Sequence, residues 1–271
     1  MRIKARELSV ERVVRAVARR VADLPAAAAW SQGDVAKANR AALGKLHGSC
    51  AGETAVIICN GPSLNKTDMQ LVGKFKSIGM NRAYLMYEQW GFEPTFFTSI
   101  NHLVLTQFSD DIRKLAGPKF VDFHLRGLLQ PEDGFLYFRV PPRLHDRFVG
   151  DIREPITSGG TVTFVTLQLA YFLGFSKVVI VGMDHRFSAK GHANAKQTRT
   201  ENEDKDHMHP DYFPKGITWE LPDLHRSELA YALARDAFAS DGREIIDATV
   251  DGACRVFRKE SLEVALGAAP S

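Results

Sequence analysis

An apolar segment that ends abruptly at Asn-Gly-Pro-Ser is the most informative feature of this chain. Residues 55–59 read Ala-Val-Ile-Ile-Cys, and Asn60, Gly61, Pro62 and Ser63 follow directly. A short apolar run of strand-forming residues is typical of a strand buried on both faces, as in a parallel sheet. Gly61 lets the backbone approach a bound group closely, and Pro62 fixes the next step of the turn. Open α/β sheets bind ligands at the carboxyl ends of their strands, so the turn suits a nucleotide site, although an ordinary strand-to-loop turn explains it equally well.

The same pattern recurs along the chain after residue 53. Further strands are expected over 76–80, 95–99, 119–123, 134–138, 177–181 and 244–246, and helices over 68–75, 160–173 and 224–240. Strands that alternate with helices indicate a mostly parallel sheet with helices on both faces. The predicted fold class is therefore α/β and Rossmann-like, in one nucleotide-sugar-binding domain over residues 51–271.

Residues 1–50 differ from the rest and are expected to form an N-terminal helical arm. Residues 9–24 place arginines among valines at helical spacing, which predicts a basic amphipathic helix with Ser9 as its N-cap and Pro25 as its end. A second, polar helix is expected over 33–46. Such an arm either lies on a membrane surface or packs on the domain or on another subunit. Valines in place of Trp, Phe and Leu favour packing.

Composition narrows the classes of protein to which this chain can belong. It has 271 residues, 45% of them hydrophobic and 25% charged, which is usual for a globular protein. The net charge of +3 suits an anionic substrate or membrane surface, and no nucleic-acid-binding motif is present. Three scattered cysteines do not make a disulfide framework, which favours a reducing compartment. The sequence shows no signal peptide and no membrane span, so a cytoplasmic location is expected.

Three successive strands are each followed by an asparagine: Asn60, Asn81 and Asn101. Right-handed crossovers place the carboxyl ends of parallel strands at one edge of the sheet. The three amides are therefore expected to line one cleft, where they offer donors and acceptors to a base, a ribose or a sugar hydroxyl. Each asparagine taken alone is also an ordinary turn residue.

A second candidate site lies just before the helix expected over 160–173. Thr157, Ser158 and Gly159 combine hydroxyl groups with the first of two consecutive glycines. This combination suits an N-cap and equally a phosphate held at a helix N-terminus. The lysine of a Walker loop and the Gly-x-Gly-x-x-Gly fingerprint are both missing from the sequence.

A long polar connection over residues 185–222 is predicted to form a lid. Connections of this length inside a compact α/β domain are usually functional or disordered. His207 or His209 could act as a general base, and Tyr212 could donate a hydrogen bond to a departing phosphate. A zinc site built from His185, His207 and His209 is a rival interpretation. A solvated flap with inert histidines is another.

Taken in order, these segments resemble the bacterial sialyltransferases of glycosyltransferase family 42. They also resemble the broader superfamily of 6-hydroxymethylpterin diphosphokinase-like proteins and motility-associated glycosyltransferases. The resemblance covers most of residues 53–250, and its matching pieces are Asn60-Gly61-Pro62-Ser63-Leu64, Asn81, Asn101, Thr157-Ser158-Gly159 and the segment 173–184. Residues 209–222 and 247–252 also resemble surface-polysaccharide biosynthesis members of this superfamily.

The resemblance implies specific roles for the residues that match. The implied donor-binding residues are Asn60, Gly61, Pro62, Ser63, Asn81, Asn101, Thr157, Ser158, Gly159 and Gly182. It also implies that Asp184 closes the pocket, that His209 or, as second choice, His207 is the base, and that Tyr212 contacts the leaving phosphate.

This chain departs from the family pattern at two points. Tyr212 follows both histidines instead of preceding them, and Pro155-Ile156 replaces an arginine ahead of the Thr-Ser-Gly segment, with Arg153 further upstream. The first departure bears on the roles of the lid histidines and Tyr212. The second bears on recognition of sialic acid itself rather than on binding of a nucleotide sugar.

The preferred hypothesis is a metal-independent inverting glycosyltransferase without a cofactor. It would transfer a sialic-acid-like (nonulosonic) sugar from a CMP donor to a glycan or glycolipid acceptor in bacterial lipopolysaccharide or capsule biosynthesis. It would work as a homo-oligomer at the inner face of the cell membrane, with contact through the N-terminal helix. The alternative is Mg²⁺- and ATP-dependent pyrophosphate transfer to a hydroxymethylpterin-like alcohol, with Asp184 and Asp247 as metal ligands. A third hypothesis is a non-enzymatic member with a vestigial pocket.

Overall fold

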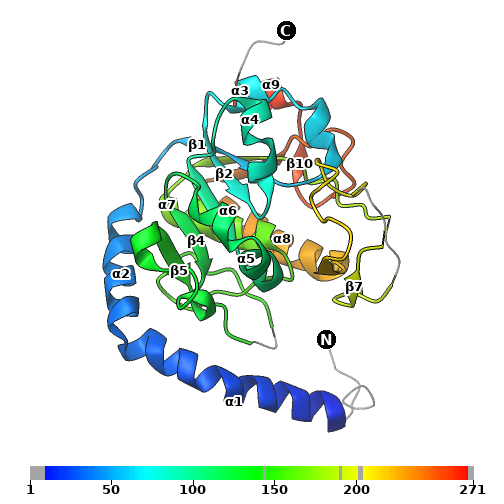
Figure 1. Cartoon of the computed structure of the whole chain (residues 1–271). Coiled ribbons are helices and arrows are strands. Elements are labelled where there is room, and N and C mark those ends of the chain that lie inside the picture. The colour runs from blue at the N-terminus through cyan, green and yellow to red at the C-terminus, as the bar shows by residue number, and fades with distance from the viewer. Residues whose placement is uncertain (1–9, 143–144, 189–190, 201–203, 268–271) are drawn as a thin grey trace.

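The computed structural model describes residues 10–142, 145–188, 191–200 and 204–267, which contain one extended parallel sheet (Figure 1). Its strands pair in the order β10-β9-β6-β1-β2-β3-β4-β5, and every pairing is parallel. The strands are β1 (Thr54–Ile58), β2 (Lys76–Met80), β3 (Phe96–Ser99), β4 (Lys119–Asp122), β5 (Phe135–Phe138), β6 (Lys177–Val181), β9 (Glu244–Asp247) and β10 (Arg258–Lys259). The predicted α/β, Rossmann-like fold class is confirmed.

The apolar run in β1 lies at the centre of this sheet because it supplies two hydrophobic layers at once. Val56 and Ile58 join one buried cluster, whereas Ala55 and Ile57 join the other. Successive side chains of a strand point to opposite faces, so a strand that is apolar at every position must be covered on both. Ile58 is in register with neighbouring residues at the ends of β2 and β6, so these three strands end together.

The direction in which the sheet grows reverses between β1 and β6. From β1 the chain proceeds through β2, β3 and β4 to β5 on one side, whereas β6, β9 and β10 extend the other side. In doubly wound sheets, the crevice outside the carboxyl ends at such a reversal is the usual ligand site. The turns that follow β1 and β6 therefore occupy the position where a ligand is expected.

Helices cover both faces of the sheet. They are α2 (Asp34–Leu46), α3 (Met69–Val72), α4 (Tyr87–Trp90), α5 (His102–Gln107), α6 (Ser109–Arg113), α7 (Val162–Leu173), α8 (Leu224–Ser240) and α9 (Leu262–Leu266). The helix α7 is buried along most of its length and packs between α8 and the central strands. The position of α8 matches the sequence prediction, and α7 begins two residues later than predicted.

The N-terminal helix α1 (Val10–Gln32) runs along the bottom of the view in Figure 1 and leads into α2. The prediction that Pro25 ends this helix is wrong, because the helix continues through it. Proline removes one backbone hydrogen bond and is costly inside a helix. The turn beyond it is held by tertiary packing, since the Trp30 ring lies edge-on to Phe123 with centroids 4.9 Å apart. The predicted N-cap, Ser9, lies outside the described residues.

The helix α2 closes the outer edge of the sheet. The Asn39 side chain donates a hydrogen bond to the carbonyl of Tyr137 in β5 and accepts one from its N–H, both at 2.8 Å. This amide takes the place of a neighbouring strand, which an exposed sheet edge would otherwise recruit from another chain. Ala36 and Leu43 of the same helix are fully buried against the domain.

The connection between β6 and α8 carries a small antiparallel hairpin, formed by β7 (Lys196–Thr198) and β8 (Thr218–Glu220). Tyr212, Phe213 and Trp219 from this connection are buried in the same cluster as the central strands. The described part of the lid is therefore packed on the domain rather than fully solvated.

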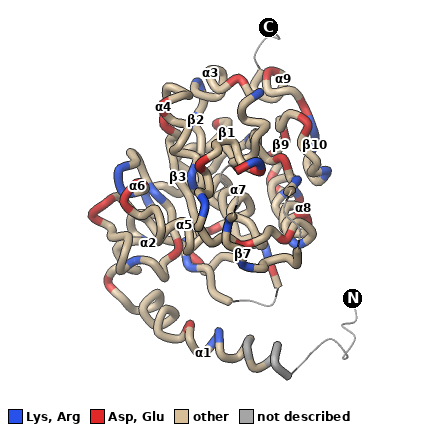
Figure 2. Tube along the Cα trace, turned by 45° about the vertical axis from the view of Figure 1, so that its right-hand side comes forward, with Lys and Arg blue, Asp and Glu red and all other residues tan. Residues whose placement is uncertain are grey.

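Basic and acidic residues are interspersed along the Cα trace of the described chain (Figure 2). Among the described residues, no helix has both the length and the apolar character that a bilayer span requires.

Candidate active site

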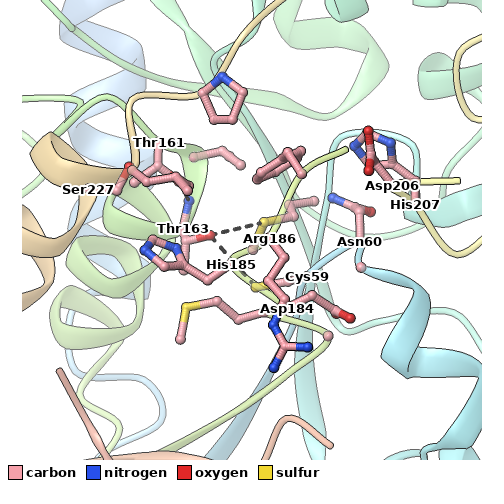
Figure 3. A pocket seen from close by; sticks show the side chains of 18 of the residues that line it. Cys59, Asn60, Thr161, Thr163, Asp184, His185, Arg186, Asp206, His207 and Ser227 are labelled. Carbon is pink, nitrogen blue, oxygen red and sulfur yellow. Dashed lines mark hydrogen bonds between the residues drawn. The ribbon is translucent and has the colours of Figure 1, made fainter. Parts of the chain in front are cut away.

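A cleft of about 170 Å³ opens at the carboxyl ends of β1, β2 and β6, where the strand order reverses. Figure 3 shows Asn60 beside Asp206 and His207 of the lid, with Thr161, Thr163 and His185 on the other side. A second cavity of about 490 Å³ adjoins it, because Asn81, Gly160 and Thr161 line both. The sheet edge therefore carries two neighbouring cavities that share part of their walls, here called the first and the second compartment.

The turn after β1 is built around the carboxylate of Asp184. Ser63 donates to this carboxylate from its hydroxyl, at 2.6 Å, and from its main-chain N–H, at 3.2 Å. A Cβ atom on Gly61 would lie only 1.9 Å from Asp184 Oδ2, so a side chain at this position would collide with the carboxylate. Gly61 also donates its N–H to the carbonyl of Gly182 at 2.9 Å. These contacts join the turn after β1, at Gly61 and Ser63, to the turn after β6, at Gly182 and Asp184. Pro62 is the first residue of the short 3₁₀ helix that follows Gly61.

Asn60 presents an unpaired acceptor at the cleft. The residue is 9% exposed, and its buried Oδ1 has no hydrogen-bond partner among the described residues. Its main-chain carbonyl accepts the N–H of Met208 at 2.9 Å, which ties the lid to the end of β1. A buried acceptor without a partner costs about 1–3 kcal/mol, so a ligand that donates to Asn60 would recover that free energy.

Asn81 and Asn101 have more of their hydrogen-bonding capacity engaged. Asn81 adopts a positive φ of 50°, which asparagine tolerates better than most residues, and its Oδ1 accepts the Ser99 hydroxyl at 2.8 Å. Asn101 caps α5, and its Oδ1 accepts the N–H groups of Leu103 and Val104 at 3.0 and 3.3 Å. Asn60 and Asn81 line the first compartment, whereas Asn81 and Asn101 line the second. The expectation that all three amides line one cleft is therefore wrong, because the strand ends that carry them are spread along the sheet edge and only Asn81, in the middle, borders both cavities.

His207 is the lid histidine that lines the cleft. Its Nδ1 lies 2.9 Å from Oδ2 of Asp204, whose side chain is fully buried. Burial opposes ionisation of Asp204, but the hydrogen bond and charge of His207, the Asp206 N–H and the charge of Arg199 together outweigh it and lower the pKa of this carboxyl. The His207 ring stacks on Tyr212 with centroids 3.9 Å apart and planes 3° from parallel. The imidazole is therefore held by a carboxylate at one nitrogen and by an aromatic ring on one face.

Tyr212 lines the same cleft but is 2% exposed. Burial raises the pKa of its hydroxyl, although a hydrogen bond with Asn81 acts in the opposite direction. The hydroxyl therefore stays protonated at neutral pH and can act as a donor.

His209 is not among the residues that line either compartment. Its Nδ1 accepts the main-chain N–H of Asp211 at 3.1 Å, within the lid itself. The structure therefore places the first-choice base outside the cleft and the second-choice base inside it.

In the Thr157-Ser158-Gly159 segment, Thr157 and Gly159 support neighbouring parts of the fold, whereas Ser158 lines the second compartment. The Thr157 hydroxyl accepts the Arg147 N–H and donates to the Arg147 carbonyl, so it braces a neighbouring loop. A Cβ on Gly159 would lie 2.5 Å from Ala230 Cβ, so this glycine allows α8 to pack closely. Ser158 lines the second compartment, and Thr161 caps α7 by accepting the Thr163 N–H at 3.2 Å.

The rival zinc interpretation is not supported, because His185 and His207 line the cleft but His209 does not. Within the described residues, no group of three or more His, Cys, Asp or Glu side chains is arranged to hold a metal ion. His185 contacts Glu228 instead, at 3.2 Å.

Two residues that support the site, Asp204 and Arg82, were not predicted from the sequence. Asp204 had one available signal, its position three residues before His207 in the polar lid. Arg82 had little signal beyond its place after Asn81 at the end of a strand. Its guanidinium is buried and lies 3.7 Å from the centre of the Phe108 ring. It donates hydrogen bonds to the main-chain carbonyls of Asp211, at 2.7 Å, and Tyr212, so it holds this part of the lid against the domain.

Comparison with known proteins gives one family and one solved structure. A family model described as 6-hydroxymethylpterin diphosphokinase MptE-like matches residues 34–190. No curated protein matches the chain significantly in sequence. The solved structure of the MAf glycosyltransferase from Magnetospirillum magneticum AMB-1 is similar, with a TM-score of 0.50 and 14% sequence identity over 79% of this chain and 34% of that one. This chain thus spans about a third of that protein, and a likeness at this identity shows a shared fold.

The expected superfamily is confirmed, whereas the narrower resemblance to glycosyltransferase family 42 has no support from these matches. The family match runs from α2 past the end of β6, and so includes the turns after β1 and β6 and the three asparagines, whereas His207 and Tyr212 lie outside it. Because the match covers more than half of the chain, this protein belongs to the 6-hydroxymethylpterin diphosphokinase MptE-like family.

Proposed function

We propose that this protein is an inverting glycosyltransferase that transfers a sialic-acid-like sugar from a CMP donor to a glycan or glycolipid acceptor. The observation that carries this proposal is that Asn60, whose buried Oδ1 is unpaired among the described residues, lines the same cleft as His207, which is paired with the buried Asp204. The MptE-like family and the fold shared with a glycosyltransferase support it.

The nucleotide would occupy the first compartment. The exocyclic amino group of cytosine is a hydrogen-bond donor, and Asn60 Oδ1 is an acceptor without a partner among the described residues. Asn81 and Thr161 add uncharged polar groups where this compartment meets the second one. A base that presented only acceptors at this position would leave Asn60 unsatisfied, which gives the cleft a reason to prefer cytosine over uracil.

His207 would serve as the base. Its Nδ1–H donates to Asp204, so the second ring nitrogen, Nε2, is left as the proton acceptor. The acceptor hydroxyl loses its proton to Nε2 as its oxygen forms a bond to the anomeric carbon, and the bond from that carbon to the CMP phosphate oxygen breaks. Tyr212 would donate a hydrogen bond to the departing phosphate, because burial keeps its hydroxyl protonated.

Pyrophosphate transfer from ATP is the second candidate, because the family is named for that activity. It requires carboxylates that hold Mg²⁺, and the candidates were Asp184 and Asp247. Asp184 accepts two hydrogen bonds from Ser63, and Asp247 lies 2.6 Å from Lys259 Nζ. These engagements make both carboxylates weaker metal ligands, which favours glycosyl transfer.

Ligand binding separates the two candidates. Calorimetry on the full chain should detect CMP without Mg²⁺, with weaker responses to UDP and ATP. The variant Asn60→Ala should weaken CMP binding about tenfold, the effect of losing one hydrogen bond to a buried group. Binding of ATP that requires Mg²⁺ and exceeds CMP binding would replace this proposal with the pyrophosphate transfer.

Turnover tests the base. His207→Ala should slow transfer from the CMP donor by about 10²–10⁴-fold, whereas His209→Ala, the matched control, should stay near the wild-type rate. Asp204→Asn should lower the rate and alter its dependence on pH, because the amide no longer fixes the protonated nitrogen of His207. Wild-type turnover in His207→Ala would remove this residue from the mechanism.

A further inference from the structure

We propose that a basic pocket beside the donor cleft binds an anionic group, phosphate or carboxylate, of the acceptor. The pocket has a volume of about 370 Å³, and its lining residues are Arg186, Thr249, Asp251, Gly252, Arg255 and Lys259. Its assignment to the acceptor rests on the proposed glycosyl transfer, whereas the anion site itself stands on the charges described below.

The pocket lies at the same edge of the sheet as the donor cleft. It is formed by the loop that follows β9 and by β10, the neighbours of β6 on the far side of the strand-order reversal. Arg186 lines both the pocket and the donor cleft (Figure 3). The Ala253 N–H donates to the Asp184 carbonyl at 2.9 Å, which ties the loop to the donor cleft. A ligand held here would therefore adjoin a sugar bound in that cleft.

The pocket carries an excess of positive charge. Two of the charged residues that line the pocket have partners of opposite charge: Lys259 pairs with Asp247 at 2.6 Å, and Asp251 pairs with Lys66 at 3.4 Å. Arg186 has no carboxylate partner among the described residues and donates only to the main-chain carbonyl of Asp251, at 2.5 Å. The exposed side chain of Arg255 has no partner at all in the described structure. Two guanidinium groups therefore remain to be neutralised.

The loop that forms the pocket is held firmly. Lys259 Nζ donates to the Gly252 carbonyl at 3.0 Å, and a Cβ on Gly252 would lie 2.9 Å from that nitrogen. Thr249 accepts the Met183 N–H at 3.0 Å through its hydroxyl. These contacts fix the loop against β6, so Arg186 and Arg255 project from a rigid base. Guanidinium groups bind phosphate and carboxylate through paired hydrogen bonds, and a fixed base limits the entropy that binding costs.

The position of the charge favours the acceptor over the nucleotide. The donor compartment is lined at Asn60, Asn81 and Thr161 by uncharged groups that suit a base and sugar hydroxyls. The two unneutralised arginines lie towards β9 and β10, beyond Asp184. An acceptor with a phosphate or carboxylate near its reactive hydroxyl would place that group here while its hydroxyl faces the donor cleft.

The test is a titration of the full chain with inorganic phosphate at low ionic strength, in the presence of saturating CMP. Arg255→Gln should weaken phosphate binding at least about tenfold and leave CMP binding unchanged. Arg20→Gln is the matched control, because Arg20 is an exposed arginine of α1 that has no partner in the described structure. Equal phosphate binding by wild type and Arg255→Gln would overturn the site.

Two further outcomes separate this site from the proposed function. If CMP does not bind but phosphate binding still depends on Arg255, the CMP-dependent activity fails and the anion site stands. If saturation with CMP-sialic acid, but not with CMP, abolishes phosphate binding, the carboxylate of the donor fills the pocket, and the assignment to the acceptor is overturned.

Discussion

Replacement of Gly61 by alanine tests whether the turn after β1 is built around Asp184. Gly61 has an ordinary φ of −73°, so alanine meets no backbone strain at this position. The added Cβ would instead lie 1.9 Å from Asp184 Oδ2 and 2.7 Å from the Gly182 carbonyl oxygen. Real Cβ atoms do not approach other atoms so closely, so the carboxylate must leave its place on Ser63.

The cost of this displacement has two parts. The hydroxyl and the N–H of Ser63 lose a charged acceptor, and hydrogen bonds to charged groups contribute about 1.5–3 kcal/mol. Overpacking in a filled region costs about 1–3 kcal/mol. Because relaxation relieves part of each, we expect Gly61→Ala to lower the free energy of unfolding by about 2–4 kcal/mol. At about 2–4 °C per kcal/mol, the Tm falls by roughly 4–16 °C.

Thermal unfolding followed by circular dichroism measures this difference. Gly127→Ala is the matched control, because Gly127 is exposed and a Cβ there would meet nothing within 4 Å. The control should change the Tm by no more than a few degrees. In the double variant Gly61→Ala/Ser63→Ala the two costs should be clearly less than additive, because both variants break the same contact. A Tm for Gly61→Ala equal to that of Gly127→Ala would refute this account of the turn.

Three further predictions concern regions outside the cleft. Asn39→Ala should lower the free energy of unfolding, measured by urea denaturation, by about 2–5 kcal/mol, because it leaves the buried N–H and C=O of Tyr137 without hydrogen-bond partners. An unchanged denaturation midpoint would show that the amide does not protect the edge of β5. The hydrogen bond to Asp122 raises the pKa of His124, against the effect of burial, so the charged imidazole contributes stability that is full below about pH 6.5 and is lost as pH rises through its raised folded pKa. The Tm difference between wild type and His124→Gln should therefore shrink from pH 6 to pH 9, and a constant difference would contradict this assignment. All three cysteines are buried, and burial raises the pKa of the Cys59 thiol to about 12. A thiol reagent at pH 8 should therefore label none of them in the folded protein and all three in the urea-unfolded protein. Rapid labelling of Cys59 in the folded protein would disprove its burial.

Local sequence was sufficient to predict the central architecture. The bounds predicted for β2, β6 and α8 match the structure, because each element carries its own apolar run or helical spacing and ends at a polar or glycine residue. The position of the candidate site at the sheet edge followed from the same signals, since parallel strands put their carboxyl ends at one edge. The turns after β1 and β6 needed no long-range information to be identified.

The chemistry at those turns depended on contacts that no local pattern encodes. Asp184 reaches Ser63 across 121 residues, and Asn39 reaches Tyr137 across 98. Which of His207 and His209 lines the cleft depended on how the lid folds, with His207 stacked on Tyr212. The extension of α1 past Pro25 depended on the packing of Trp30 against Phe123.

The sequence by itself determined the order and type of the elements and the edge of the sheet where the candidate site lies, because hydrophobic periodicity and turn residues act over a few positions. Only the tertiary structure decided which polar groups are paired and which remain free, among them Asn60 Oδ1 and the guanidinium of Arg255. The physical reason is that satisfaction of a buried or charged group is a property of everything packed around it, and those neighbours come from distant parts of the chain.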